Sequence, residues 1–322
     1  MKLLTRGSSQ YALISVDVRQ NSVSRGVDPV TEHLDNPSLI FRTATEVAEL
    51  DFPAEDADAA GKRAVWSGAI APGWDIAANA NGGYLMAIVA RALSAALDRP
   101  DPVTISAHYF YPGKPGDVTI ETRVLKQGRS FSSGTAVLLS EGRALLSCIG
   151  TFGDLAKVSG PEIIDQGPPV MPDPDDCLPV VATDTFPPPF MGKIELRLHP
   201  EDGQFLLGKR TGQALMRGWF RLRTDEPADT IALLCAADAF PPTAFNAHFP
   251  VAWTPTIELT VHVRARPEPG WLRCKFATHF VTGGFLEEDG EIWDSTGRLV
   301  AQSRQLALVP RGHTAPAPQQ PA

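Results

Sequence analysis

The chain has 322 residues, of which 43% are hydrophobic and 20% are charged, as in an ordinary soluble globular protein with a substantial core. Its formal net charge of −8 and its lack of a long Lys/Arg run argue against nucleic acid as a main partner. The four cysteines are widely spaced, and three lie in apolar segments, which favours a small hydrophobic role over a disulfide or a metal site and suggests a reducing, cytoplasmic setting.

Residues 1–38 are predicted to form an N-terminal extension of mixed polarity. Their longest apolar stretch, residues 11–16, is too short for the core of a signal peptide. Residues 80–97 come closest to a membrane span, but Arg91 and the Gly82-Gly83 pair interrupt them. A buried helix is therefore predicted there, and no membrane span.

The first half opens with an almost uncharged helix, predicted over residues 82–97. Four strands are predicted to follow it, at residues 103–111, 118–126, 130–140 and 143–152. A helix that is apolar nearly all round must be enclosed by other elements, and a curved antiparallel sheet of about five strands can wrap it. This is the hotdog arrangement, predicted here for a first unit at residues 39–155.

The second half repeats this order. Residues 156–190 are rich in proline, which cannot continue a helix or a central strand, and are predicted to be a linker. A second unit is predicted over residues 191–310, with a helix at 231–240 and strands at 256–264, 271–280, 285–294 and 298–309. Thr104-Ile105 recurs as Thr256-Ile257 and Gly142-Arg143 recurs as Gly297-Arg298, at similar offsets, which indicates a duplicated unit.

The strand predicted at residues 256–264 alternates strictly between apolar and polar positions. One face is expected to carry Ile257, Leu259, Val261 and Val263, and the other Thr256, Glu258, Thr260, His262 and Arg264. The tail at residues 311–322, rich in Pro, Gln and Ala, is predicted to be disordered.

Asp238 is the only charged side chain in the apolar run at residues 231–240. On a helix, Ile231, Leu234, Cys235 and Asp238 share one stripe, so the carboxylate should face the core. A buried carboxylate costs several kcal/mol unless it has partners or its pKa rises. Two interpretations are open: a chemical role for Asp238, or a helix end at which it is hydrogen-bonded to a neighbouring loop.

Three short patterns in the first half carry a family resemblance. The sequence Asn81-Gly-Gly-Tyr84, the aromatic strand HYFYPG at residues 108–113 and the turn GRSFS at residues 128–132 resemble successive motifs of the acyl-CoA thioesterase II family. The second half adds patterns around Asp238 and beyond, so the resemblance covers roughly residues 40–310. It implies an α+β fold, the double hotdog, in which two copies of a curved antiparallel sheet each wrap a central helix.

The resemblance also implies a hydrolytic site in the second unit. By position, Asp238 matches the family's helix carboxylate, Thr256 its hydroxyl and Gln305 its amide on the last strand. Asp238 would be the general base for a water molecule, and the other two would orient that water or the carboxylate. The corresponding positions of the first copy, near Leu85, Thr104 and Gly150, lack the carboxylate and the amide, which predicts one site per chain.

Gly82 and Gly83 are candidates for binding the developing oxyanion. Their N–H groups would lie at a helix N-terminus, where the helix dipole favours negative charge. The alternative is that these glycines only permit close packing. The departure from the family lies at residues 133–136, where arginines often follow the GRSFS-like turn; Arg129, Lys126 and Arg91 are possible substitutes for binding the phosphates of coenzyme A.

The predicted activity is hydrolysis of an acyl-CoA to a free acid and coenzyme A, without a metal or a cofactor. A noncatalytic acyl-CoA or lipid-binding hotdog protein and an enoyl-thioester hydratase are the alternatives. A hydratase would need an Asp and a His close to one helix, and residues 231–240 contain no His; His108 and His262 are expected to be structural. Because hotdog sheets expose edges and flat faces, a homo-oligomer is expected.

Overall fold

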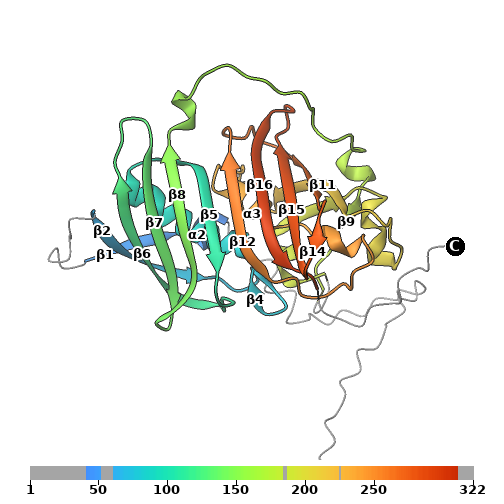
Figure 1. Ribbon diagram of the computed structural model, residues 1–322, viewed down its shortest axis with the longest axis horizontal. Helices are drawn as coiled ribbons and strands as arrows, with labels where there is room; N and C mark the ends of the chain where they lie inside the picture. The colour runs from blue at the N-terminus through green and yellow to red at the C-terminus, as the bar shows by residue number, and fades with distance from the viewer. Residues whose placement is uncertain (1–40, 52–60, 184–186, 225, 311–322) are drawn as a thin grey trace, which may run out of the picture. The chain divides into compact units, whose positions relative to one another are not determined.

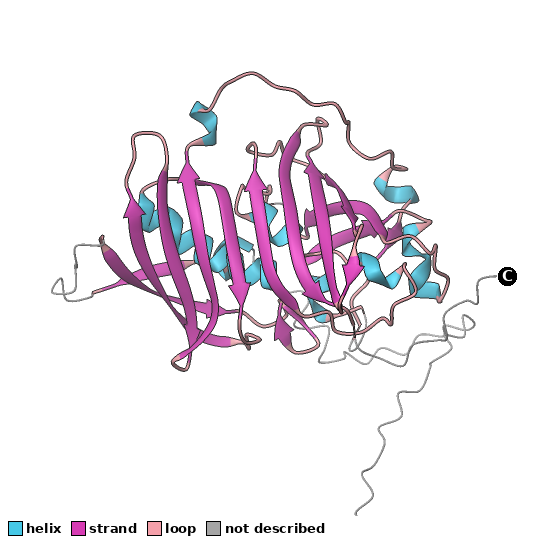
Figure 2. Ribbon diagram, viewed as in Figure 1, coloured by secondary structure: helices cyan, strands magenta, loops and turns pink. Residues whose placement is uncertain are grey.

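The structure is a computed structural model that describes residues 41–51, 61–183, 187–224 and 226–310. The predicted extension at residues 1–38 and the predicted tail at residues 311–322 lie outside the described residues. The described part is built around a sheet of 14 strands, with one long helix, α2 (Gly82–Leu97), and two short ones, α1 (Phe41–Ala44) and α3 (Ala232–Ala236) (Figures 1 and 2).

The first unit contributes six neighbouring strands to this sheet. Their order is β1 (Val47–Leu50), β2 (Arg63–Ile70), β6 (Gly116–Lys126), β7 (Ser132–Ser140), β8 (Arg143–Gly153) and β5 (Asp101–Tyr109). The four strands predicted after the helix are confirmed. The two strands before the helix were not predicted, and neither was the small hairpin of β3 (Asp75–Ile76) and β4 (Asn79–Ala80) that leads into α2.

The second unit contributes the rest of the sheet. The order is β12 (Thr256–Val263), β16 (Leu299–Leu308), β15 (Phe285–Trp293), β13 (Leu272–Ala277), β11 (Leu215–Leu222), β10 (Ile194–Leu198) and β9 (Leu178–Pro179), with β14 (Val281–Thr282) paired to β15. The four predicted strands are confirmed, although β13 ends three residues before the predicted end. β9 lies inside the predicted linker, so the sheet of the second unit begins there.

The two units share one continuous sheet. β5 and β12, which are equivalent in the internal repeat, pair antiparallel, with Ile105 opposite Val261 and Ala107 opposite Leu259. Figure 1 shows these strands side by side, with α2 and α3 on the same face of the sheet. The double hotdog fold is therefore present. Backbone hydrogen bonds between β5 and β12, the strand that follows the helix in each copy, join the two copies.

Helix α2 has the bounds that its sequence predicts. Asn81 caps its N-terminus, where the side-chain Oδ1 accepts the N–H of Tyr84 at 2.8 Å, and Asp98 ends it in the left-handed region with φ 50°. Eleven of its residues are buried. The prediction of an enclosed helix is confirmed. Within the described residues, no helix combines the length and the apolar character needed to cross a membrane.

Helix α3 is shorter than predicted. The expected helix at residues 231–240 was wrong, because α3 spans only Ala232–Ala236 and Asp238 lies beyond its C-cap, Ala237. The chain continues into Pro241-Pro242, and a proline disfavours helical geometry in the residue before it and removes an N–H donor. Asp238 is thus held at a helix end rather than along a helix.

The strand β12 departs from strict alternation at its first residues. Its pairing with β16 shifts between Thr256 and Glu258, which is the mark of a β-bulge at Ile257. Thr256 is consequently opposite Ala307, a buried residue on the inner face of the sheet, while Glu258 stays on the outer face. The predicted placement of Thr256 on the face of His262 was wrong, because the bulge reverses the alternation.

The four cysteines are free and buried, as expected for small core residues. Burial raises the pKa of the thiols of Cys148, Cys235 and Cys274 well above the ordinary value. All three are therefore protonated core side chains at neutral pH.

Candidate active site

The carboxylate of Asp238 lies between the end of α3 and the start of α2. Its Oδ2 accepts the backbone N–H of Gly83 at 2.9 Å and the side-chain amide of Asn81 at 3.0 Å. The same amide donates to the backbone oxygen of Asp238 at 2.7 Å. One residue of the second unit is therefore anchored on the helix N-terminus of the first.

The other carboxylate oxygen faces the strands. Oδ1 of Asp238 accepts the amide Nε2 of Gln305 at 3.2 Å, and this Nε2 also lies 2.5 Å from Oγ1 of Thr256. The three residues predicted from the family resemblance thus come together from the end of α3, from β12 and from β16. Asp238 thus lies at a helix end with hydrogen-bond partners, as the structural interpretation expects, and its chemical role stays a prediction.

The strand register explains why Thr256 and Gln305 meet. Gln305 lies opposite Leu259, and Ala307, two residues further along β16, lies opposite Thr256. Side chains two residues apart in a strand share a face. The bulge at Ile257 places Thr256 on that inner face, within reach of the amide.

Asn81 belongs to the site although its motif does not reveal this. Its Oδ1 caps α2 and its Nδ2 holds Asp238, so one side chain fixes both the start of the helix and the carboxylate. The sequence signal was the N-cap pattern of Asn before a helix. That pattern predicts a cap, and the second contact depends on a residue 157 positions away.

The two glycines allow the helices to approach each other. A Cβ on Gly83 would lie 2.5 Å from the backbone oxygen of Leu234 and 2.9 Å from Cβ of Asp238, and one on Gly82 would lie 3.0 Å from Oδ2 of Asp238. Close packing is therefore one reason for these glycines. The N–H of Gly83 is bound to the carboxylate here, and the oxyanion role of Gly82 and Gly83 stays a prediction.

The environment makes Asp238 a stronger base than an exposed aspartate. Burial is the largest influence and raises its pKa to about 6, while hydrogen bonds from the N–H groups of Gly83 and Gly82 and from the amides of Gln305 and Asn81 oppose the rise. An acid with this pKa is mostly ionised at neutral pH. It can accept a proton from water with a smaller penalty than an ordinary carboxylate.

Tyr109 forms a wall of the site that was not predicted. Its hydroxyl donates to the backbone oxygen of Gly82 at 3.0 Å, and a Cβ on Gly82 would lie 3.1 Å from its ring. Burial, and then the charge of Asp238, raise the pKa of this hydroxyl well above its usual value. Tyr109 is therefore a neutral hydrogen-bond donor beside the carboxylate.

Glu288 is a second buried carboxyl group close to this cluster, and it too was not predicted. It lies on β15 directly opposite Gln305, is 7% exposed, and accepts the N–H of Thr243 at 2.8 Å through Oε2. Burial is the largest influence and raises its pKa to about 7; hydrogen bonds from Thr243 oppose the rise, and the charge of Asp238 adds to it. Residues 287–289 are all acidic, so the sequence does not show which of the three faces the inside of the sheet.

Other predicted candidates lie elsewhere. His108 and His262 are exposed on the outer face of the sheet, as the alternation of their strands requires, away from the inner face that carries Gln305. Nη1 of Arg91 pairs with Oδ2 of Asp229 at 2.8 Å, and Lys126 and Arg129 are exposed. The structure does not bring these residues to Asp238.

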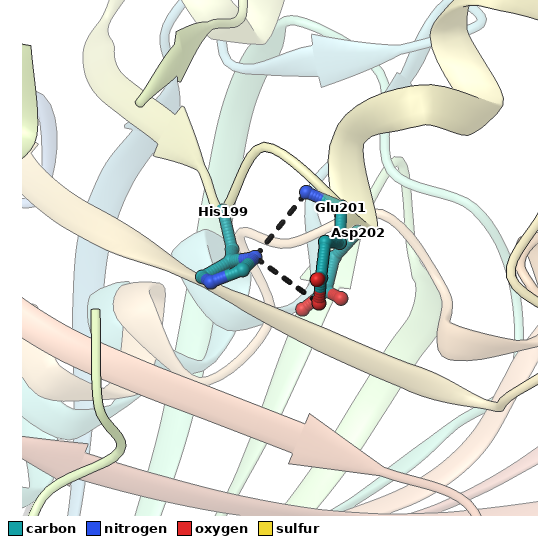
Figure 3. A group of neighbouring side chains, drawn as sticks. All are labelled: His199, Glu201 and Asp202. Atoms are coloured by element: carbon teal, nitrogen blue, oxygen red, sulfur yellow. Dashed lines mark hydrogen bonds and ion pairs between the residues drawn. The ribbon is translucent and has the colours of Figure 1, made fainter. Parts of the chain in front are cut away.

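His199, Glu201 and Asp202 form a compact cluster that resembles a set of metal ligands (Figure 3). The guanidinium of Arg217 already occupies it: Nε and Nη2 donate to the two oxygens of Asp202 at 2.8 Å and 3.0 Å, and Nη2 donates to Glu201 at 3.2 Å. Burial, and then Arg217, lower the pKa of His199. The cluster is an ion-pair network centred on an arginine.

Comparison with protein families gives two matches. Residues 70–153 match the model of the acyl-CoA thioesterase N-terminal domain, and residues 174–309 match that of the acyl-CoA thioesterase C-terminal domain. The second range contains Asp238, Thr256 and Gln305.

Individual relatives cover most of the chain. An uncharacterized protein of Mycobacterium tuberculosis is 29% identical over 272 residues, which is 76% of this chain and 91% of that protein. The solved structure of a candidate thioesterase II from Thermobifida fusca is 31% identical, covers 84% of this chain and 97% of its own, and has a TM-score of 0.73. An acyl-CoA thioesterase II from Mycobacterium marinum, 17% identical over 84% of this chain and 97% of its own with a TM-score of 0.59, shares the fold.

Proposed function

The chain belongs to the acyl-CoA thioesterase II family, and from this we propose that it hydrolyses an acyl-CoA thioester to a free acid and coenzyme A with Asp238 as the general base. The family and the fold support thioesterase activity in general. The assignment to Asp238 is supported above all by one observation: Gln305 joins its buried carboxylate to Thr256.

In the proposed reaction, Asp238 takes a proton from a water molecule as the water oxygen attacks the thioester carbonyl. A C–O bond forms, and the electron pair of the carbonyl moves onto its oxygen as an oxyanion. When the carbonyl forms again, the C–S bond breaks, and the departing thiolate takes the proton from Asp238. The products are a free acid and a thiol, and no covalent enzyme intermediate is required.

The contacts of Asp238 fit the movement of negative charge from its carboxylate to the substrate oxygen in the proposed reaction. While ionised, its Oδ2 holds the N–H of Gly83. Once Asp238 is protonated it is a weaker acceptor, and the negative charge has moved to the substrate oxygen. We propose that the N–H groups of Gly82 and Gly83 then stabilise this oxyanion at the N-terminus of α2.

Thr256 and Gln305 orient the reacting groups. The hydroxyl of Thr256 accepts from Gln305, which leaves its own proton free to bind the attacking water, while the amide fixes the rotation of the carboxylate. Correct orientation of a reacting pair contributes a large share of the acceleration in such reactions.

The alternative of a hydratase is disfavoured by the surroundings of Asp238. Among the residues that the structure describes, none of the hydrogen-bond donors to Asp238 is a histidine; they are Asn81, Gly82, Gly83 and Gln305. A noncatalytic acyl-CoA or lipid-binding protein would gain nothing from a buried base, which costs stability. It stays as the alternative that the next experiment decides.

Release of free thiol from a panel of short, medium, long and aromatic acyl-CoAs tests the proposal. The purified protein is expected to release thiol from at least one acyl class far faster than buffer alone, and the preferred class identifies the substrate. Binding of acyl-CoA without release from any member of the panel would replace the proposal with the binding-protein alternative.

The hydroxyl of Thr256 has a matched test on the same strand. Thr256→Val keeps the shape and removes one hydrogen-bonding group, so kcat/KM should fall by about tenfold, equivalent to about 1.4 kcal/mol. Thr260→Val, whose hydroxyl binds Ser106 on the outer face, is the control and should stay within about twofold because it lacks contact with the site. Equal effects of the two substitutions would show that Thr256 has no special role.

A further inference from the structure

Glu288 faces the site from the strand next to Gln305. The two residues are opposite partners in the antiparallel pair of β15 and β16, and both lie on the inner face. Side chains opposite each other in such a pair have Cβ atoms about 5 Å apart. The mechanism proposed above does not use this buried carboxyl.

The amide of Gln305 has to be held in one orientation. Its Nε2 serves both Asp238 and Thr256, and Thr256 belongs to β12, on one side of β16. The two atoms of an amide leave its carbon in different directions. With Nε2 turned to the β12 side, Oε1 is left for the β15 side, where Glu288 lies.

The charged groups around Glu288 oppose its ionisation. Asp238, after α3, and Glu287, its neighbour on β15, are negative and both raise its pKa, after burial as the main cause. The N–H and hydroxyl of Thr243 favour the ionised form and only partly offset the rise. Across the sheet, Arg304 is paired with Asp289 on the outer face, and the exposed turn at His279 binds Glu287 through its N–H.

We propose that Glu288 is a positioning residue of this site: its protonated carboxyl donates to Oε1 of Gln305 and keeps Nε2 directed at Asp238 and Thr256, and its ionisation weakens catalysis. A protonated acid has an O–H to donate to the amide oxygen. An ionised carboxylate can only accept, so it repels that oxygen and competes for the N–H groups of Nε2. It also adds a second negative charge where an oxyanion must form.

This inference rests on the proposed function, and the pH profile of kcat/KM tests it. The wild type should lose at least about tenfold in kcat/KM between pH 6.5 and pH 8.5 as Glu288 ionises. Glu288→Gln, which keeps a donor and cannot ionise, should stay within about threefold of the wild type at pH 6.5 and lose less than about threefold over that range. Glu288→Ala should lower kcat at both pH values with little change in KM, because the amide loses its partner.

Glu291→Gln, at an outward position of β15 where Glu291 binds Lys275, is the matched control. It should retain the alkaline loss of the wild type, since Glu291 does not face Gln305. An alkaline loss of the same size in Glu288→Gln would overturn the inference.

A second measurement separates this inference from the proposed function. The side-chain amide signal of Gln305 in a ¹⁵N correlation spectrum, identified by its loss in Gln305→Ala, should move in two steps with pH in the wild type and in one step, from Asp238, in Glu288→Gln. This titration is read without any substrate. If no acyl-CoA releases thiol but the second step disappears in Glu288→Gln, the proposed function fails and the link between Glu288 and Gln305 stands; identical titrations would refute that link.

Discussion

Replacing Asp238 with asparagine is expected to lower kcat for thioester hydrolysis by about 100-fold or more, within the usual contribution of a general base. An amide cannot take the proton of the attacking water. Asparagine keeps the size of the side chain and one acceptor oxygen for the N–H of Gly83, so the fold should persist. Thiol release by the wild type and the variant, on the preferred acyl-CoA, measures the effect.

The wild type and Asp238→Asn together also test how catalysis by the proposed base depends on pH. Only ionised Asp238 accepts a proton, and its pKa is raised to about 6. The kcat/KM of the wild type should therefore fall as the pH drops below about 6, and the residual activity of the variant should lack this acidic limb. Asp289→Asn, on the outer face, is the control and should keep both the rate and the limb.

As the pH rises through 6, the folding stability of the wild type should fall, whereas its activity should rise. The pKa of Asp238 in the folded protein, about 6, lies above its value of 3.8 in an exposed residue. The folded state thus binds the proton more tightly, and stability contributed at low pH is lost as the pH rises through 6. Asp238→Asn has no such loss, so its stability relative to the wild type should rise by on the order of 2 kcal/mol between pH 4 and pH 8, as measured by urea unfolding.

An Asp238→Asn variant whose stability relative to the wild type falls between pH 4 and pH 8 would contradict this account. It would mean that the hydrogen bonds of the ionised carboxylate outweigh the cost of burying it. If the prediction holds, burial of the ionised base lowers the free energy of unfolding, as is common for catalytic groups.

The second large effect is expected from Gly83→Ala. The added Cβ would lie 2.5 Å from the backbone oxygen of Leu234 and 2.9 Å from Cβ of Asp238, and backbone atoms of α3 can move only if the helices separate. Overpacking of this kind costs about 3 kcal/mol. Alanine in a helix gains about 1 kcal/mol over glycine, which is too little to offset the clash.

The substitution should also abolish most of the activity, because separating α2 from α3 displaces Asp238 from its donors. Urea unfolding gives the loss of stability, and thiol release under folding conditions gives the loss of rate. Gly160→Ala, where a Cβ meets open space, is the control and should change neither. A stable and active Gly83→Ala variant would show that the helices are not held as closely as the structure places them.

Local sequence patterns were sufficient for most of the regular structure. The bounds of α2 follow from an apolar run with an Asn cap, and eight of the strands that follow the two helices appear as alternating runs between turns. These signals are local, since each depends on residues a few positions apart. The stop signal at Pro241 was present as well; it keeps a helix from continuing past the residues before the proline but does not specify the end of α3 at Ala236.

The full candidate site could be predicted only through resemblance. Asp238 stands out in the sequence as the only charged side chain of an apolar run, but Thr256 and Gln305 are ordinary residue types that only their match to family motifs singled out. The bulge at Ile257 was invisible in the alternation of β12, because a bulge is defined by pairing with the neighbouring strand and not by the strand itself. The side on which Thr256 lies was therefore decided by tertiary structure.

The sequence by itself determined the repeat, the enclosed helix, eight of the strands and the family, because periodicity and motif order are properties of the chain. Tertiary structure alone decided which partners surround the carboxylate: Asn81 reaches Asp238 across 157 positions and Gln305 across 67. Tertiary structure also placed Glu288 opposite Gln305. The sequence does not show this strand register, because residues 287–289 are all acidic. Burial and charge coupling arise only when these distant groups meet, and they set the pKa values on which the proposed chemistry depends.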